Sequence, residues 1–146
     1  MLRDFDPGDQ AAVRGLVLGG MRERWGDAYD PFANPDLDDI SVTYVGRGAE
    51  VVVAEIEGDI VATGTLLPEG GARGRIVRVS VDPAHRRRGL GRQVVEELVR
   101  RARRRGMHEV LVRTDTPWTS AVALYRSSGF DDVGRDATDT HFALRL

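Results

Sequence analysis

The chain has 146 residues, of which 41% are hydrophobic and 30% charged, and it contains no cysteine. This length and composition predict one globular domain over residues 1–146 with a core of its own. The absence of cysteine excludes disulfide-stapled modules, thiolate metal sites and enzymes with a cysteine nucleophile. All 21 side chains in the lysine and arginine count are arginines, which also excludes Schiff-base chemistry and a Walker-type phosphate lysine.

The formal net charge is only −2, but the charges are unevenly distributed along the chain. Residues 1–71 carry five arginines against fourteen acidic residues, and residues 72–105 carry twelve arginines against three. Residues 106–146 carry four arginines against six acidic residues. The central third is therefore strongly basic and the N-terminal half strongly acidic. This asymmetry predicts one surface for an anionic ligand and an opposed surface for a cationic one.

The first third of the chain is predicted to form a strand and two helices. Leu2–Phe5 is a candidate strand, because turn-forming residues follow it directly. Apolar residues then recur at helical spacing, which predicts a helix over about Asp9–Arg24. Residues Trp25–Pro35 have the composition of a loop. Asn34 followed by Pro35 is typical of a helix N-terminus, so a second short helix is expected there.

The middle of the chain is predicted to form strands. Two segments rich in β-branched residues, Ala49–Ile56 and Ile60–Leu67, flank the turn Glu57–Asp59 and predict a hairpin. The glycine-rich segment Pro68–Gly74 is expected to be a mobile connection. Another strand, Arg75–Val81, is predicted to follow it. By strict alternation, one face of that strand would carry Val77, Val79 and Val81, and the other would carry Arg78 and Ser80.

The most regular apolar pattern covers Gly89–Arg105 and predicts an amphipathic helix with arginines on its polar face. Gly106 is the expected glycine after its C-terminus. A short buried strand, Glu109–Thr114, is predicted next, followed by a helix over about Ser120–Ser127 and a final strand over Thr140–Leu146. The buried stripe of the long helix would consist of Leu90, Val94, Val95, Leu98, Val99 and Ala102.

The segment that joins the strand Arg75–Val81 to the long helix has the features of an anion-binding site. Its sequence is DPAHRRRGLG, residues 82–91. The two glycines allow the backbone to approach a ligand closely, and the first N–H groups of the following helix have no intrahelical partner. Three consecutive arginines add charge at the same point, so the segment is predicted to bind phosphate groups.

Two motifs resemble the signatures of the GNAT superfamily of N-acetyltransferases. Arg86, Gly89 and Gly91 match its acetyl-CoA signature, which is Arg or Gln, two residues, Gly, one residue, and Gly or Ala. Residues 121–130 resemble a second signature, Ala-x-x-Leu-Tyr-x-x-x-Gly-Phe. The two motifs occur in the family's order, and the predicted elements suit the family along the whole chain.

This resemblance implies an α/β (α+β) fold, with a mixed, mostly antiparallel sheet of about six or seven strands and about four helices. It also implies direct transfer of an acetyl group from acetyl-CoA, as co-substrate, to a primary amine. By the same resemblance, Tyr125 would be the general acid that protonates the departing thiolate. The implied cofactor-binding residues are Val79, Ser80, Val81, Arg86, Arg87, Arg88, Gly89, Leu90, Gly91 and Arg92.

The sequence departs from the family pattern at two positions. Trp118 stands where many members have an asparagine, and Arg75 stands where some members place a glutamate base. The general base is therefore open. An attacking amine arrives mostly as ammonium and must lose a proton. The candidates to take this proton are Glu55, Glu57, Asp82 and an ordered water chain.

The acceptor is expected to bind near the loop after the first helix. Trp25, Tyr29 and Phe32 lie there among several aspartates, and such a surface suits a cationic amine. An equally acceptable interpretation is that the aromatic residues are core and the aspartates are helix caps. Arg78 is a candidate to contact an anionic group of the substrate.

Two other functions remain open on the sequence. One is a GNAT-like domain that binds acetyl-CoA as a sensor without catalysis, and the other is nucleic-acid binding through the arginine-rich segment. An acidic chain without aromatic residues between those arginines disfavours nucleic acid. No metal is expected, because the spacing of His85, His108 and His141 matches no ligand pattern. No signal or membrane segment is recognised, so a cytoplasmic protein is expected. The family resemblance also makes a homodimer a candidate assembly.

Overall fold

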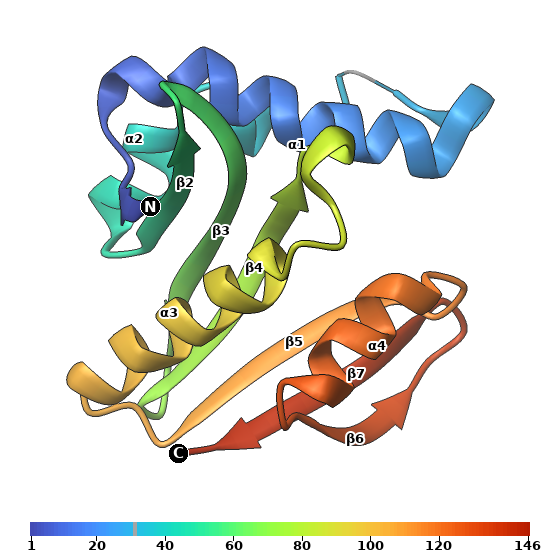
Figure 1. The fold of residues 1–146 in the computed structure, drawn as a ribbon. Helices are drawn as coiled ribbons and strands as arrows, with labels where there is room; N and C mark the ends of the chain where they lie inside the picture. Colours follow the sequence, from blue (N-terminus) through green and yellow to red (C-terminus); the bar gives the residue numbers. More distant parts are fainter. Residues whose placement is uncertain (31) are drawn as a thin grey trace.

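The computed structural model describes residues 1–30 and 32–146, and these form one mixed sheet covered by helices on both faces (Figure 1). The strands are β1 (Leu2–Asp4), β2 (Glu50–Ile56), β3 (Asp59–Glu69), β4 (Arg73–Val81), β5 (Glu109–Asp115), β6 (Asp131–Arg135) and β7 (Asp139–Arg145). They lie in the order β1-β2-β3-β4-β5-β7-β6. Only β4 and β5 are parallel neighbours, which confirms the predicted mixed, mostly antiparallel sheet.

Four α-helices within the described chain complete the fold, as predicted. They are α1 (Gln10–Trp25), α2 (Ile40–Thr43), α3 (Leu90–Arg104) and α4 (Thr119–Ser127). Residues of α1 and α2 pack on one face of the sheet, and residues of α3 and α4 pack on the other. None of the helices in residues 1–30 and 32–146 is long and apolar enough to cross a membrane.

The core lies in two layers, one on each face of the sheet. The larger layer joins α3 and α4 to the sheet and contains the whole predicted stripe of α3. Val94, Val95 and Leu98 in that stripe are fully buried. Burial of one such side chain contributes roughly 1.5–3 kcal/mol, so α3 is firmly fixed against the sheet. The smaller layer lies under α1 and α2 and includes Val13 and Val17.

The two hairpins of the N-terminal half differ in how well they were predicted. Glu57 and Gly58 both adopt positive φ between β2 and β3, which is the backbone of a type I′ turn and confirms the predicted hairpin. The predicted mobile connection over Pro68–Gly74 is mostly strand instead. Pro68 pairs with Gly74 and Glu69 with Arg73, so residues 70–72 alone form the turn.

Two further elements differ from the sequence prediction. The second helix does not start at Asn34, whose side chain accepts a hydrogen bond from Arg78 instead of capping a helix. A short 3₁₀ turn covers Pro35–Leu37, and α2 starts at Ile40 with Asp39 as its cap. Strand β6 was missed, because all five of its residues are exposed and carry no apolar alternation.

Candidate active site

A cavity lies where β4 and β5 separate. Residues 73–75 pair with residues 109–111 in parallel register, and beyond these three pairs the two strands diverge (Figure 1). The cavity between them has a volume of about 790 Å³. It is lined by the diverging strands, the last turns of α1, the start of α3, and α4. The splayed sheet therefore gives the molecule a binding site that reaches the middle of the fold.

The divergence begins at a bulge in β4. One extra residue lies between Val77 and Ser80, opposite Gly64 of β3. Arg78, in the bulge, adopts a φ of 57°, in the left-handed region that non-glycine residues rarely visit. On its β5 side, the part of β4 from residue 76 to residue 81 pairs with no strand among the described residues. Its main-chain groups on that edge are therefore open to the cavity.

The bulge also corrects the predicted faces of β4. Val77 packs in the α1 and α2 layer, whereas Val79 and Val81 pack in the α3 and α4 layer. The prediction that all three valines share one face is wrong, because the extra residue shifts the alternation after Val77. Arg78 and Ser80 do lie on the α1 side, where the side chain of Ser80 approaches Gly20.

Arg78 is held by side chains of the segment before α2. Its Nε and Nη2 atoms donate to Asp36 at 3.0 and 2.8 Å, and Nη2 also donates to Asn34 at 3.1 Å. Burial raises the pKa of Asp36, but the hydrogen bonds from Arg78 and Tyr44 outweigh it and lower the pKa overall. Burial and the Asp36 carboxylate raise the pKa of Tyr44 to about 12. Arg78 lines the cavity, yet these partners occupy its guanidinium group.

The turn before α3 offers free main-chain donors to the cavity. Arg87 and Gly89 adopt φ values of 63° and 76°, and the first helical hydrogen bond runs from Gln93 N to Gly89 O. The amides at the start of α3 are therefore without intrahelical partners. Gly91 lines the cavity, and a Cβ there would lie 3.5 Å from Leu124. The geometry is that of an anion-binding helix N-terminus with close backbone access.

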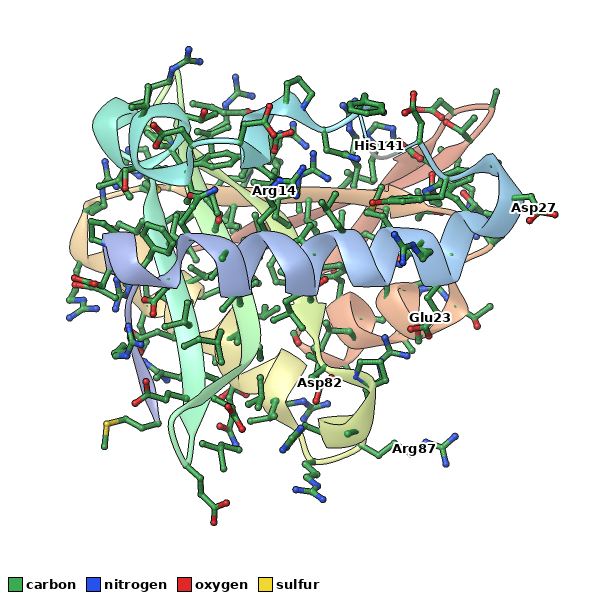
Figure 2. All side chains as sticks on the ribbon, turned by 90° about the horizontal axis from the view of Figure 1, so that it is seen from above. Arg14, Glu23, Asp27, Asp82, Arg87 and His141 are labelled. Atoms are coloured by element: carbon green, nitrogen blue, oxygen red, sulfur yellow. The ribbon has the colours of Figure 1, made fainter. Side chains whose placement is uncertain are left out.

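The arginines of this turn fall into two groups. Arg86 donates to both carboxylate oxygens of Glu23, which ties the turn to α1. Arg87, Arg88 and Arg92 are exposed and make no ion pair with any described residue, and Figure 2 shows Arg87 extending outward from the turn. The cavity brings together nine of the ten predicted cofactor-binding residues, and Arg88 lies outside its lining.

Tyr125 reaches the same cavity from α4. Its side chain is 5% exposed, and its ring contacts Phe130 and Phe142 at centroid distances of 5.7 and 5.9 Å. Its hydroxyl group has no hydrogen-bond partner in the part of the chain that the structure describes. Burial raises the pKa of Tyr125, and the positive charge of Arg24 acts in the opposite direction. The phenol is therefore a protonated donor across the neutral range.

Arg24 was not predicted as a site residue. It comes from the last turn of α1, lines the cavity, and places its guanidinium group over the ring of Trp118 at the start of α4. Desolvation lowers the Arg24 pKa to about 10, so the group keeps its charge at neutral pH. No local sequence pattern indicates this contact, because α1 and α4 are far apart in the chain.

The structure does not bring the predicted acceptor aromatics into the cavity. Trp25 and Phe32 are 47% and 89% exposed, so neither is core, and neither lines the cavity. Tyr29 is half-buried beneath the guanidinium group of Arg22 and also lies outside the lining. The neighbouring aspartates Asp36 and Asp39 serve as an ion-pair partner and a helix cap.

The predicted base candidates also lie elsewhere. Glu55 pairs with Arg3 at 3.0 Å near the β1 edge, and Asp82 holds His85 at 2.7 Å. Glu57 occupies the turn between β2 and β3. The carboxylates that do line the cavity are Glu23, Asp115 and Asp139. The latter two meet through the pairing of β5 with β7, which sequence patterns do not reveal.

The arginines at the other end of α3 are largely neutralised. Arg101 pairs with Glu97, Glu50 and Asp4, and Arg105 pairs with Glu50. Arg100 and Arg104 pair with Glu97. The basic third of the sequence thus includes an ion-paired cluster at the C-terminal end of α3, and Arg87, Arg88 and Arg92 near its start, which have no ion-pair partner among the described residues.

The model of the acetyltransferase (GNAT) family matches residues 19–130, which include the cavity, the turn and Tyr125. The chain belongs to this family. Human N-acetyltransferase 8 is 32% identical to this GNAT chain over 120 residues, covering 78% of it and 53% of the human protein. The chain spans about half the length of that curated relative.

Solved structures show the same GNAT fold. A GNAT-family acetyltransferase from Staphylococcus aureus Mu50 superposes with a TM-score of 0.91 at 16% identity, covering 100% of this chain and 98% of the other. The PaiA N-acetyltransferase of Thermoplasma acidophilum, in complex with coenzyme A, superposes with a TM-score of 0.88 at 11% identity, with the same coverage. At such identities the likeness establishes the fold of the GNAT chain.

Proposed function

We propose that residues 1–146 form one GNAT domain that transfers the acetyl group of acetyl-CoA to a primary amine. The observation that carries this proposal is the cavity itself. It joins an open strand edge, a helix N-terminus with free amides, and the hydroxyl group of a largely buried tyrosine that has no partner among the described residues. The family membership and the coenzyme A complex of the PaiA enzyme support it.

In this proposal the turn before α3 binds the anionic half of the co-substrate. The amides of Leu90, Gly91 and Arg92 point along the helix axis and provide donors for pyrophosphate oxygens. Arg87 and Arg92 line or border the same end of the cavity and supply positive charge. Arg88 stays in the proposed set as a peripheral charge. Arg86 acts mainly by fixing the turn to Glu23.

The open edge of β4 holds the flexible arm of the co-substrate. The main-chain groups of Val79, Ser80 and Val81 are available on the side where β5 has diverged. Strand-like hydrogen bonds along this edge would place the thioester beside the bulge. Main-chain N–H groups there can also stabilise the oxyanion that forms when the amine attacks.

Tyr125 acts as the general acid. The amine nitrogen forms a bond to the thioester carbonyl carbon, the carbon–sulfur bond breaks, and the sulfur takes the phenolic proton. The nitrogen then gives its extra proton to the tyrosinate, so Tyr125 returns to its starting state. The raised pKa of Tyr125 ensures that this proton is present at neutral pH.

The test is a thiol-release assay with acetyl-CoA and a panel of spermidine, kanamycin, amino-acid amides and peptide N-termini. Mass spectrometry should find one added acetyl group on the amine that supports thiol release. Binding of acetyl-CoA without thiol release for any member of a broad panel would instead favour a sensor. Absence of acetyl-CoA binding, with salt-dependent DNA binding, would refute the proposal.

A further inference from the structure

Two carboxyl groups face each other inside the cavity on its β5 side. Asp115 is the last residue of β5, and Asp139 is the first residue of β7, directly opposite it. The two residues are cross-strand partners, their carboxyl groups influence each other, and both residues line the cavity. Glu23, the third carboxylate of the lining, is already occupied by Arg86. Asp115, which has no ion-pair partner among the described residues, is therefore the carboxyl group of the cavity most open to a ligand.

The pair lies on the α1 and α2 face of the sheet. Val110 and Val112 of β5 pack in the α3 and α4 layer, so by alternation Asp115 points to the opposite face. Phe142 of β7 places Asp139 on that same opposite face. The anion-binding turn belongs to α3, on the other side of the sheet. An acceptor reaching this pair would thus approach the thioester from the face opposite the phosphate groups.

Burial and the neighbouring Asp139 make Asp115 a stronger base than an ordinary carboxylate, although cationic groups also lie nearby. Arg24 of α1 faces Asp115, and Arg113 Nε lies 3.9 Å from Asp139. His141, two residues after Asp139 on the same face of β7, pairs with Asp136 instead. Burial and the neighbouring Asp139 raise the pKa of Asp115, while Arg24 opposes this rise. When both carboxyls are ionised, a proton taken up is shared by the pair.

A second feature of the cavity points independently to a reacting ligand. Tyr125 is only 5% exposed, and its hydroxyl group has no hydrogen-bond partner among residues 1–30 and 32–146. A phenol without a protein partner and a carboxyl group with a raised pKa, that of Asp115, line one cavity. Two titratable groups that differ in this way are suited to opposite roles, one as acid and one as base.

We propose that the Asp115 carboxylate, paired with Asp139, binds the ammonium group of the acceptor and is its general base. This inference rests on the proposed acetyl transfer and adds the acceptor half of the site. It also specifies the acceptor class as an amine that is a cation when it binds.

The proton balance of the step is complete. The ammonium group gives one proton to the Asp115 and Asp139 pair and becomes a neutral amine. That amine forms the carbon–nitrogen bond, and the thiolate leaves with the proton of Tyr125. The tyrosinate regains a proton from the newly bonded nitrogen. The shared proton on the carboxyl pair then passes to water, so one proton is released for each ammonium acetylated.

The inference is tested with the variants Asp115→Asn and Asp139→Asn, with Asp131→Asn on exposed strand β6 as the matched control. Rates are measured across pH with the best substrate of spermidine, kanamycin and amino-acid amides. Methoxyamine serves as a second nucleophile, because it is uncharged at neutral pH. Acetyl-CoA affinity and thermal unfolding are measured for each variant. A carboxyl ¹³C NMR titration follows the pair in the wild-type protein and in Asp139→Asn.

Asp115→Asn should lower kcat/KM for the cationic amine by on the order of 10²-fold, with a smaller loss for methoxyamine. Acetyl-CoA affinity should be unchanged in both variants and in the control. The acidic limb of the wild-type pH profile should match the raised carboxyl titration, and that titration should fall in Asp139→Asn.

Three results would overturn the inference, and they differ from one another. If Asp115→Asn acetylates the amine at the wild-type rate and its rate falls with acid as in the wild type, the carboxyl pair is not the base. The proposed function would remain intact. Equal losses for the cationic amine and for methoxyamine in Asp115→Asn also refute a role in deprotonation. Acetyl-CoA binding without acetylation of any probe by the wild-type protein refutes the proposed function and this inference with it.

Discussion

Tyr125 combines an apolar environment with a free hydroxyl group. Its ring is fixed between Phe130 and Phe142, whereas its oxygen has no partner in the described part of the chain. The hydroxyl group is therefore free to donate to a ligand in the cavity that Tyr125 lines. The charge of Arg24 moderates the raised pKa of Tyr125 without making the phenol ionise near neutrality.

Replacing Tyr125 by phenylalanine should separate catalysis from folding. The ring contacts remain and no protein hydrogen bond is lost, so thermal stability and acetyl-CoA affinity should be nearly unchanged. Turnover should fall by roughly 10²-fold or more, because the thiolate loses its proton donor. Steady-state kinetics with calorimetric binding of acetyl-CoA would check this. Unchanged turnover would remove the acid role from Tyr125.

The motif residues were predictable from sequence because each motif is local. Gly89 and Gly91 lie within one turn, and Tyr125 lies within one helix, so their spacing alone places them. Asp115 and Asp139 were not predictable, because they meet only through the register of two strands. Arg24 was missed for the same reason, since its contact with Trp118 joins the end of α1 to the start of α4.

At the scale of elements, the bulge of β4 depends on a glycine in the neighbouring strand. A Cβ on Gly64 would lie 2.6 Å from Val94 Cγ1, 3.1 Å from Leu98 and 3.3 Å from Val79. Gly64 therefore lets α3 pack directly on β3 beside the extra residue of β4. The close approach of helix and sheet, and with it the shape of the cavity, rests on this position.

Gly64→Ala should destabilise the protein by about 1–3 kcal/mol, because fully buried side chains of α3 must move. Acetyl-CoA affinity should fall as well, since Val79 belongs to the cavity lining. Gly15→Ala is the control, because a Cβ there meets nothing within 4 Å and α1 gains helix propensity. Chemical denaturation would measure both variants. A neutral effect of Gly64→Ala would mean that α3 can shift freely.

The ion pair between Arg78 and Asp36 should stabilise the bulge. The Asp36 side chain is only a quarter exposed, and Arg78→Met leaves its carboxylate without an ion-pair partner. We expect the free energy of unfolding to fall by roughly 1–3 kcal/mol. The double variant Arg78→Met with Asp36→Asn should lose less unfolding free energy than the sum of the losses in the two single variants. Denaturant unfolding of the double-mutant cycle would check this. Strict additivity would contradict the coupling.

The pH dependence of this pair has a definite sign. The folded-state pKa of Asp36 is lowered, so its contribution is complete above the unfolded pKa of about 3.9. Stability is lost as the pH falls from there through the folded pKa. The wild-type protein should therefore lose more stability than Arg78→Met in this acidic range, while both behave alike near neutrality.

Elements with strong periodicity were predicted well and the others were not. The stripe of α3 determined its bounds to within a residue, because six apolar positions recur on one face. The faces of β4 were partly wrong, because one extra residue breaks a strict alternation and leaves no trace in composition. Strand β6 is polar throughout and is held by its pairing with β7, so no local pattern could reveal it.

At the scale of the molecule, the charge asymmetry of the sequence has two different outcomes. The arginines at the C-terminal end of α3 are paired with acidic residues of β1, β2 and α3 itself, and these pairs join the helix to the sheet edge. The arginines before α3 remain without ion-pair partners in the described chain, Arg86 excepted. The predicted anionic-ligand surface is therefore smaller than the sequence suggested, and it is concentrated at the cavity.

The two halves of the sheet are joined between β4 and β5 by only three residue pairs. A ligand that contacts the β4 edge, the start of α3 and α4 would connect these halves and should stabilise the whole fold. At 100 times its Kd, such a ligand adds about 2.7 kcal/mol. For a protein of this size, that corresponds to a rise in Tm on the order of 5–10 °C. Thermal unfolding with acetyl-CoA would measure it.

Salt and the arginine variants separate this stabilisation from a general effect of an anion. Raising the salt concentration should weaken acetyl-CoA binding, because exposed charges at the turn are screened. Arg87→Gln should reduce both the affinity and its salt dependence, because one unpaired cation is removed beside the free amides of α3. Arg103 lies near the C-terminal end of α3 and outside the cavity lining. Arg103→Gln should therefore change neither the affinity for acetyl-CoA nor its salt dependence. Equal effects of the two substitutions would mean that the net charge of the molecule, rather than the turn before α3, recognises the ligand.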